Sequence, residues 1–172
     1  DVIANPSFHG NAQNSGGWTA LMCAAKYNRV GYIRALHQQF PDLDPNQVNT
    51  IGMTALSCAV FQRNADAIRA LFEYFPTIDP NCMSRFDPPL ILAARSGNVE
   101  VITALAESSP LLNFEIQSRD GSSALLAAAR AGSASCIDLL IKLYPQVDPN
   151  IPNIHGLTPL LWAVDQQSVD IV

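Results

Sequence analysis

Several kinds of residue that would point to other classes of protein are scarce in this chain of 172 residues. Only 15% of the residues are charged, and lysine occurs only as Lys26 and Lys142, so arginine carries most of the positive charge. The net charge of −5 disfavours nonspecific attraction to nucleic acid or to an anionic membrane. No apolar run approaches the roughly 18 residues that a membrane-spanning helix needs. We therefore expect neither nucleic acid nor a membrane as a partner.

Paired cysteines and glycosylation acceptors are also missing. The four cysteines form no CxxC motif, and no Asn-X-Ser/Thr sequence has a permitted middle residue. Cys23 and Cys58 each stand two residues after the leucine of a recurring motif, which predicts small core residues in a reducing compartment. Both observations favour a cytoplasmic protein.

The sequence also lacks the motifs of catalysis and metal binding. It contains no phosphate-binding glycine loop, no HExxH motif and no paired carboxylates on one helical face. His37 and Cys58 belong to adjacent units, and no carboxylate is placed to orient them, so we interpret His37 as a surface residue and Cys58 as a structural one. We predict no enzyme activity, no cofactor and no metal.

The dominant feature of the sequence is a five-residue motif that recurs along the chain. Its final leucine returns at intervals of 35, 34, 35 and 35 residues, and such a period indicates stacked supersecondary units. The five copies are Gly17-Trp18-Thr19-Ala20-Leu21, Gly52-Met53-Thr54-Ala55-Leu56, Phe86-Asp87-Pro88-Pro89-Leu90, Gly121-Ser122-Ser123-Ala124-Leu125 and Gly156-Leu157-Thr158-Pro159-Leu160.

Each unit predicts two helices. The first helix is an alanine-rich segment, and in four copies a Thr or Ser precedes it and can cap its free N–H groups. In two units this helix ends near a glycine, at Gly97 and Gly132. The second helix has isoleucine 12 and leucine 15 residues after the motif leucine, which places both on one buried face. Twenty residues after that leucine a proline ends the helix, at Pro41, Pro76, Pro110 and Pro145.

An extended arm with a turn follows each helix pair. Its sequence is Asp-Pro-Asn at residues 44–46, 79–81 and 148–150. The third unit departs from this pattern, with Asn113-Phe114-Glu115 in its arm and Phe86 where the other units have glycine. We expect both of its connections to be locally distorted.

A helix, a tight loop, a second helix and an extended arm at a period near 33 residues resemble the ankyrin repeat family. The resemblance covers about residues 9–172 and rests on the Gly-X-Thr-Ala/Pro-Leu motifs, the Ala-Ala pairs after them, Arg-Ser-Gly-Asn-Val-Glu-Val-Ile at 95–102 and the last Asn of the arm. It implies an all-α solenoid of stacked antiparallel helix pairs joined by hairpin-like loops. The family's histidine after Thr-Pro-Leu is missing throughout, which implies a more purely apolar stack.

The repeat describes a single domain over residues 1–172. We assign residues 17–51, 52–85, 86–120 and 121–155 to complete repeats, and residues 1–16 to the tail of a preceding repeat or an irregular lead-in segment. The incomplete repeat, 156–172, stops where its second helix would place its first buried residue. We therefore expect the chain to be part of a longer protein.

The candidate site is a binding surface. The resemblance implies that partners meet the concave side, which is made of hairpin tips and of first-helix residues outside the core. Carried over by position, the candidates are Trp18, Lys26, Tyr27, Ile51, Met53, Phe61, Gln62, Arg85, Asp87, Arg95, Arg119, Ser122, Arg130, His155, Leu157 and Asp165.

The N-terminal candidates are aromatic and aliphatic, which is typical of the anchors in protein interfaces. A second interpretation is that Trp18, Met53 and Phe61 only cover one another between repeats.

The middle candidates include four of the eight arginines of the chain. Arg95 and Arg130 stand near the ends of first helices, where a cation offsets the helix dipole without any partner. Arg85 and Arg119 lie at turn tips, so they are the better candidates to contact a carboxylate or phosphate of a partner.

We interpret the chain as a noncatalytic scaffold that binds another protein or a peptide segment, an acidic one included, on its concave face. We expect it to be a monomer in the intact protein. Two alternatives stay open: a regulatory or substrate-targeting arm of a larger multidomain enzyme, such as a kinase or modifying effector, and a spacer that binds nothing.

Overall fold

The structure, a computed structural model, describes residues 9–83 and 85–165, and these residues form nine α-helices and no strand. The all-α prediction is therefore confirmed. The helices are α1 (Ala20–Lys26), α2 (Val30–Gln39), α3 (Ala55–Phe61), α4 (Ala65–Tyr74), α5 (Pro89–Arg95), α6 (Val99–Ser108), α7 (Ala124–Arg130), α8 (Ala134–Leu143) and α9 (Pro159–Asp165).

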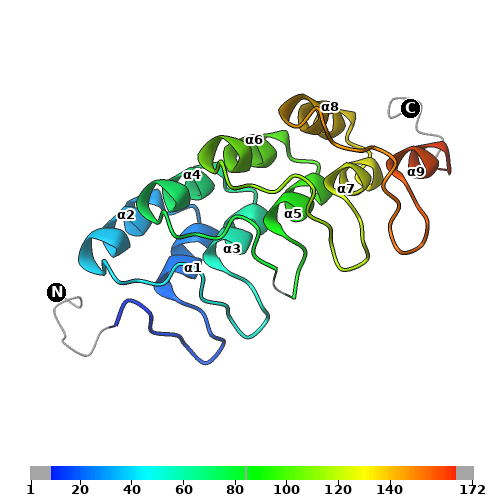
Figure 1. Cartoon of the computed structure of the whole chain (residues 1–172). Coiled ribbons are helices and arrows are strands. Elements are labelled where there is room, and N and C mark those ends of the chain that lie inside the picture. The colour runs from blue at the N-terminus through cyan, green and yellow to red at the C-terminus, as the bar shows by residue number, and fades with distance from the viewer. Residues whose placement is uncertain (1–8, 84, 166–172) are drawn as a thin grey trace.

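The helices lie in two layers (Figure 1). The seven-residue helices α1, α3, α5, α7 and α9 pack side by side in one layer, and the ten-residue helices α2, α4, α6 and α8 form the other. The connections between units extend from the layer of short helices as long loops, away from the long helices. Each complete predicted unit holds one helix pair, and the expected second helix of the last unit lies outside the described residues.

The short helices begin where the motif predicts. The side chains of Thr19, Thr54 and Ser123 accept hydrogen bonds from the N–H groups of the first turns of α1, α3 and α7. In α5 Pro89 occupies the first position, where its missing N–H has no cost.

A left-handed residue joins the two helices of each pair. Gly97 and Gly132 take this position with φ of 63° and 67°, and Asn28 and Arg63 occupy it in the first two units with φ of 52° and 61°. Asparagine tolerates this conformation through its short polar side chain, whereas an arginine there carries backbone strain.

The core runs along the stack between the two layers. The isoleucines that begin the predicted stripe, Ile33, Ile68 and Ile102, are fully buried, and Ile137 is half-buried. Helix α8, which carries Ile137, has a described long helix on one side only. No helix within residues 9–83 and 85–165 is long and apolar enough to span a membrane.

The hairpin loops are closed by asparagine side chains. Oδ1 of Asn49 accepts from the N–H groups of Ile51 and Met53 at 3.1 and 2.8 Å, and Asn14 and Asn153 make the equivalent bonds in their loops. Such bonds mimic a backbone turn. In the hairpin that leads from the second unit into the third, Met83 stands at this position. The distortion predicted for this hairpin involves Ser84, so it lies partly outside the described residues.

Asparagines at the end of the arms tie successive units together. Asn46 donates from Nδ2 to the Thr77 carbonyl at 2.8 Å and accepts at Oδ1 from the Asp79 N–H at 2.9 Å. Asn11 and Asn81 bridge to the arm that follows each of them in the same way. These amides form a ladder of polar contacts between the arms, beside the apolar contacts between the helices. The more purely apolar stack that the missing histidine implies stays a prediction.

The arm of the third unit keeps the regular turn despite its different sequence. The Glu115 N–H donates to Asn113 Oδ1 at 2.9 Å, just as the Asn46 N–H donates to Asp44 Oδ1 at 2.9 Å. The predicted distortion of this arm is wrong, because an asparagine oxygen accepts the same bond as a carboxylate.

Another contact replaces the asparagine bridge after the third arm. The Tyr144 hydroxyl donates to Glu115 Oε1 at 2.9 Å, and the Tyr144 ring stacks on Phe114 with centroids 5.5 Å apart. The hydrogen bond to the Glu115 carboxylate raises the pKa of Tyr144. A polar and aromatic contact thus takes the place of the amide ladder here.

The asparagine ladder leads to a stability prediction. Asn46→Ala removes two hydrogen bonds between units and is expected to lower the free energy of unfolding by about 1–2 kcal/mol. Urea denaturation followed by circular dichroism measures this change. Asn150→Ala is the matched control, because among the described residues the Asn150 side chain makes no hydrogen bond. Equal loss in both variants would contradict a contribution from the ladder.

Two glycines of opposite role give a second prediction. Gly132 has φ of +67° in open space, so Gly132→Ala adds only backbone strain and is expected to lower the free energy of unfolding by about 1 kcal/mol. Gly31 lies inside α2, also in open space, so Gly31→Ala is expected to raise it by about 0.5 kcal/mol. Thermal melts of both variants test the pair, and a shift in the same direction would refute it.

Candidate functional site

The surface where the hairpin loops meet the short helices is built from two positions in each unit. The first is the variable residue of the recurring motif, and the second is the last residue of the short helix, eight residues later. The loop residues are Trp18, Met53, Asp87, Ser122 and Leu157, and the helix residues are Lys26, Phe61, Arg95, Arg130 and Asp165.

In the first unit this pair makes a cation–π contact. Lys26 Nζ lies 4.8 Å from the centroid of the Trp18 ring and 5.3 Å from that of the Tyr27 ring. At a partly exposed site such a contact contributes about 0.5–1 kcal/mol. The contact fixes the positively charged amine beside the half-buried Trp18 ring.

The first two pairs together line a cleft. Trp18, Lys26, Met53 and Phe61 face it, and its volume is about 180 Å³. Ile51, Cys58 and Gln62 complete the lining. The structure thus brings together four residues that the sequence predicted for one apolar patch, namely Trp18, Ile51, Met53 and Phe61.

The residues of this cleft differ in exposure. Met53 and Cys58 are buried and form its floor, whereas Phe61 is 59% exposed and Ile51 is 47% exposed. Burial raises the pKa of the Cys58 thiol to about 12, against a smaller opposing effect of the Lys26 charge, so the thiol is neutral at pH 7. The cleft therefore presents an apolar floor with one exposed aromatic ring at its edge.

The third and fourth units carry ion pairs in place of apolar contacts. Arg95 Nη1 lies 2.6 Å from Asp87 Oδ2, and Arg130 Nη1 donates at 3.0 Å to both Asp120 Oδ2 and Ser122 Oγ. The partner of Arg95 lies in its own repeat, and Asp120 is the last residue of the repeat before that of Arg130. Both pairs add to the offset of the helix dipole that the sequence suggested.

Asp120 is the centre of a hydrogen-bonded network. Its partial burial favours the neutral acid and raises the pKa, but hydrogen bonds from Ser118, Arg130 and Ser122 outweigh that effect and hold the pKa well below its usual range. The guanidinium of Arg130 also lies 5.4 Å from the centroid of the Trp162 ring. Arg130 thus contacts Asp120, Ser122 and Trp162, and the Asp120 carboxylate compensates its charge.

Two predicted contact residues are not accessible. Ser122 is fully buried and Met53 is 7% exposed, so neither presents its side chain to a partner. The Ser122 hydroxyl instead accepts a hydrogen bond from Arg130. Met53 forms part of the floor of the cleft.

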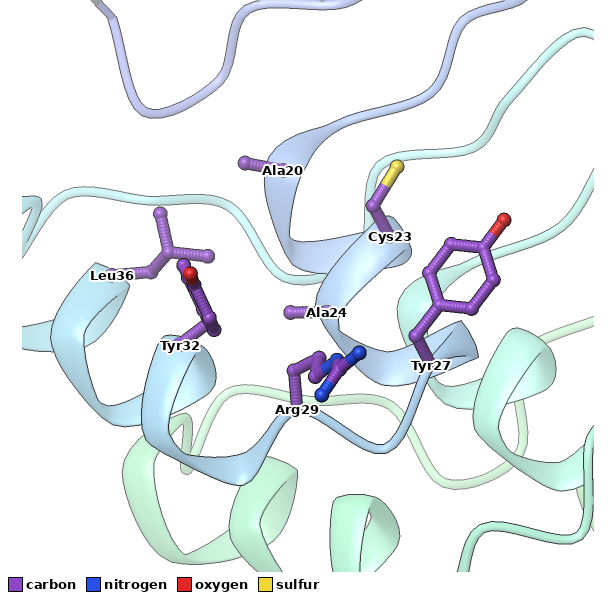
Figure 2. Close-up of a pocket in the computed structure, with 7 residues that line it drawn as sticks. All are labelled: Ala20, Cys23, Ala24, Tyr27, Arg29, Tyr32 and Leu36. Carbon is purple, nitrogen blue, oxygen red and sulfur yellow. The ribbon is translucent and has the colours of Figure 1, made fainter. Parts of the chain in front are cut away.

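The other candidates are distributed over the surface. Arg85 and Arg119 are exposed at the loop tips, and Leu157 is half-buried. Tyr27 is exposed and lines a different pocket, at the N-terminal end of the stack (Figure 2). Cys23 lines that same pocket and is exposed, so its prediction as a core residue is wrong.

Sequence reasoning missed Asp120 and Cys58 as parts of the site. Asp120 directly precedes the hairpin Gly121, and a search for a carboxylate near each helix-terminal arginine would have found it. Cys58 was predicted as a core residue, and its thiol also forms the floor of the cleft.

Within residues 9–83 and 85–165, no group of three or more His, Cys, Asp and Glu side chains is placed to hold a metal ion. His37, predicted as a surface residue, is half-buried and packs on the rings of Tyr74 and Phe75, with centroids 5.8 and 5.5 Å away. The His37 ring therefore takes part in the packing between the first two units.

Comparison with known proteins gives a consistent result. A family model described as ankyrin repeats (3 copies) matches residues 3–84, 35–114 and 90–172. A protein of Rickettsia bellii (strain RML369-C), described as an ankyrin repeat protein, is 35% identical over 75 residues. That match covers 42% of this chain and 12% of the Rickettsia protein.

Among solved structures, the crystal structure of the ankyrin repeat domain of Bcl-3, a member of the IkappaB protein family, is similar with a TM-score of 0.84. The sequence identity is 26%, and the match covers 96% of this chain and 72% of that chain. Ankyrin repeats are in general protein–protein interaction modules, and such domains are typically noncatalytic. Because the family matches extend over residues 3–172, the chain belongs to the ankyrin repeat family.

Proposed function

We propose that the chain is a noncatalytic interaction scaffold that binds a partner protein or peptide segment where its hairpin loops meet its short helices. The observation that carries this proposal is the cleft between the first two units, with Phe61 exposed at its edge. An exposed aromatic ring over an apolar floor is the arrangement of an interface anchor.

The size of the cleft favours a side chain over a cofactor. Pockets for small molecules typically have volumes of about 300–1,000 Å³, whereas this cleft has about 180 Å³. We expect an apolar side chain of the partner to enter it, packing against Phe61 and Ile51. Apolar burial then supplies most of the affinity.

The charges on this face favour an acidic partner. The face carries five basic side chains, at Lys26, Arg85, Arg95, Arg119 and Arg130, against three acidic ones, at Asp87, Asp120 and Asp165, in a chain with a net charge of −5. Asp87 and Asp120 are engaged by Arg95 and Arg130. The exposed Arg85 and Arg119 are the residues proposed to meet acidic groups of the partner, and they set orientation and association rate more than affinity.

The proposal also covers the cellular compartment and the oligomeric state of the domain. The four cysteines are free thiols, which fits a reducing compartment such as the cytoplasm. In the intact protein we expect the domain to act as a monomer.

A second candidate function is a regulatory or substrate-targeting arm of a larger enzyme. The observation that favours it is the length of the Rickettsia relative, of which the matched region covers only 12%. The full-length reading frame decides the point. A catalytic domain outside these residues supports the second candidate, and its absence leaves the scaffold.

The role of the cleft is tested with Phe61→Ala. The partner is first captured from cells of the source organism with the tagged chain and purified, and its affinity is then measured by calorimetry. Loss of the anchor is expected to weaken binding by about tenfold or more, which corresponds to about 1.4 kcal/mol.

Leu111→Ala is the matched control, because Leu111 is also a large apolar residue exposed to solvent, on the arm of the third unit. An unchanged affinity of the Phe61→Ala variant, with folding intact, removes the anchor from the account.

The role of the loop arginines is tested with Arg119→Glu. The expected result is a loss of binding to the same partner and a weaker dependence of the remaining affinity on salt, because an attractive charge pair has been replaced by a repulsive one. Titrations between low and physiological ionic strength measure the slope. Arg69→Glu, on the exposed side of α4, is the control. A slope equal to that of the unmodified chain would exclude the electrostatic role.

A further inference from the structure

The N-terminal end of the stack carries a second pocket, separate from the cleft described above. It lies between α1 and α2 and has a volume of about 500 Å³ (Figure 2). Ala20, Ala24 and Leu36 are the apolar part of its lining. Tyr32 and Arg29 add an aromatic ring and a guanidinium. The pocket thus combines an apolar surface with an exposed ring and a positive charge.

The apolar part of this pocket is the kind of surface on which helices of the stack pack. Ala55, Ala59 and Leu71 are the residues of the second unit that correspond to Ala20, Ala24 and Leu36. All three are at most 1% exposed, and their helices α3 and α4 pack on α1 and α2. The same positions at the N-terminal end therefore have the shape that receives a helix.

Tyr32 distinguishes this end from the contacts inside the stack. The corresponding residues in the next three units are Ala67, Val101 and Cys136, and each is 0% exposed. Tyr32 is 69% exposed. A side chain of this size does not fit between two units that pack as closely as those inside the stack. The end face is therefore shaped for a smaller occupant than a further helix pair.

Arg29 also departs from its counterparts. Asn64, at the same position in the second unit, donates from Nδ2 to the carbonyls of Ala25 and Lys26 in the preceding unit, at 3.0 and 2.8 Å. Arginine replaces that neutral bridge with a charge. Its side chain makes no capping hydrogen bond to α2.

The pocket and the two helices beside it carry charge of one sign. Helices α1 and α2 contain no acidic residue, although the chain as a whole has a net charge of −5. Arg29 is the one charged residue among those that line the pocket. A partner with acidic residues is therefore complementary to this face.

We propose that the N-terminal end face binds a single acidic amphipathic helix of a partner protein. The apolar stripe of that helix packs on Ala20, Ala24 and Leu36. The small alanine side chains allow the helix to approach closely. The Tyr32 ring covers one flank of the bound helix. A carboxylate of the helix pairs with the Arg29 guanidinium in a charge-assisted hydrogen bond.

The probe for this proposal is a displayed library of 20-residue helical peptides with randomised surface positions, selected on the whole chain. Enriched peptides are expected to carry apolar residues at helical spacing and an excess of Asp and Glu over the starting library. Fluorescence anisotropy then measures the affinity of a synthetic copy of the most enriched peptide. Arg29→Glu is expected to weaken it at least tenfold.

Two control variants locate the binding site. Arg69→Glu changes a partly exposed arginine on α4 and is expected to leave the affinity unchanged. Phe61→Ala is also expected to leave it unchanged, because Phe61 belongs to the other cleft. Circular dichroism confirms that each variant is folded.

Three results would overturn the proposal. One is an enriched set with no excess of acidic residues, which would indicate a purely apolar cover. Another is an affinity that Phe61→Ala lowers and Arg29→Glu does not, which would place the peptide in the cleft. The third is a concentration-dependent dimer in sedimentation that Arg29→Glu dissociates, which would make a second copy of the chain the occupant.

Discussion

A pair of helices seven and ten residues long cannot bury its apolar face by itself, so every unit of this chain depends on contact with its neighbours. Alanine-rich short helices allow the close approach that this contact needs. The asparagine ladder, with Asn46 and Asn81 as its inner members, adds hydrogen bonds between the arms. Because these contacts use the same positions in each unit, the remaining positions are free to differ.

The differences between units are concentrated at two positions, the variable loop residue of the motif and the last residue of the short helix. In the first two units these positions supply Trp18, Met53 and Phe61 and form an apolar cleft. In the third and fourth they supply Arg95 and Arg130, which form ion pairs with Asp87 and Asp120. One backbone arrangement therefore presents an apolar anchor at one end and fixed charges further along, which is how a repeated scaffold acquires a specific surface.

The sequence alone was sufficient for the family, the helix pairs and the apolar cleft, because all of these follow from positions that recur with the period. It was insufficient where a contact joins residues of different units. The bridge from Asn46 to Thr77 and Asp79 becomes visible only when the two arms are known to run side by side. The exposure of residues at the ends of the stack could not be predicted either. Cys23 and Cys58 occupy the same position in their repeats, and only Cys58 is buried.

The central claim is that partners meet the face on which Phe61 is exposed. Site-specific photocrosslinking tests it most directly, with benzoylphenylalanine placed at residue 61 and, in a parallel sample, at residue 111 on the arm of the third unit. The account predicts a covalent adduct with the partner from residue 61 and none from residue 111. An adduct from residue 111 alone would contradict it, because the partner would then lie on another face of the stack.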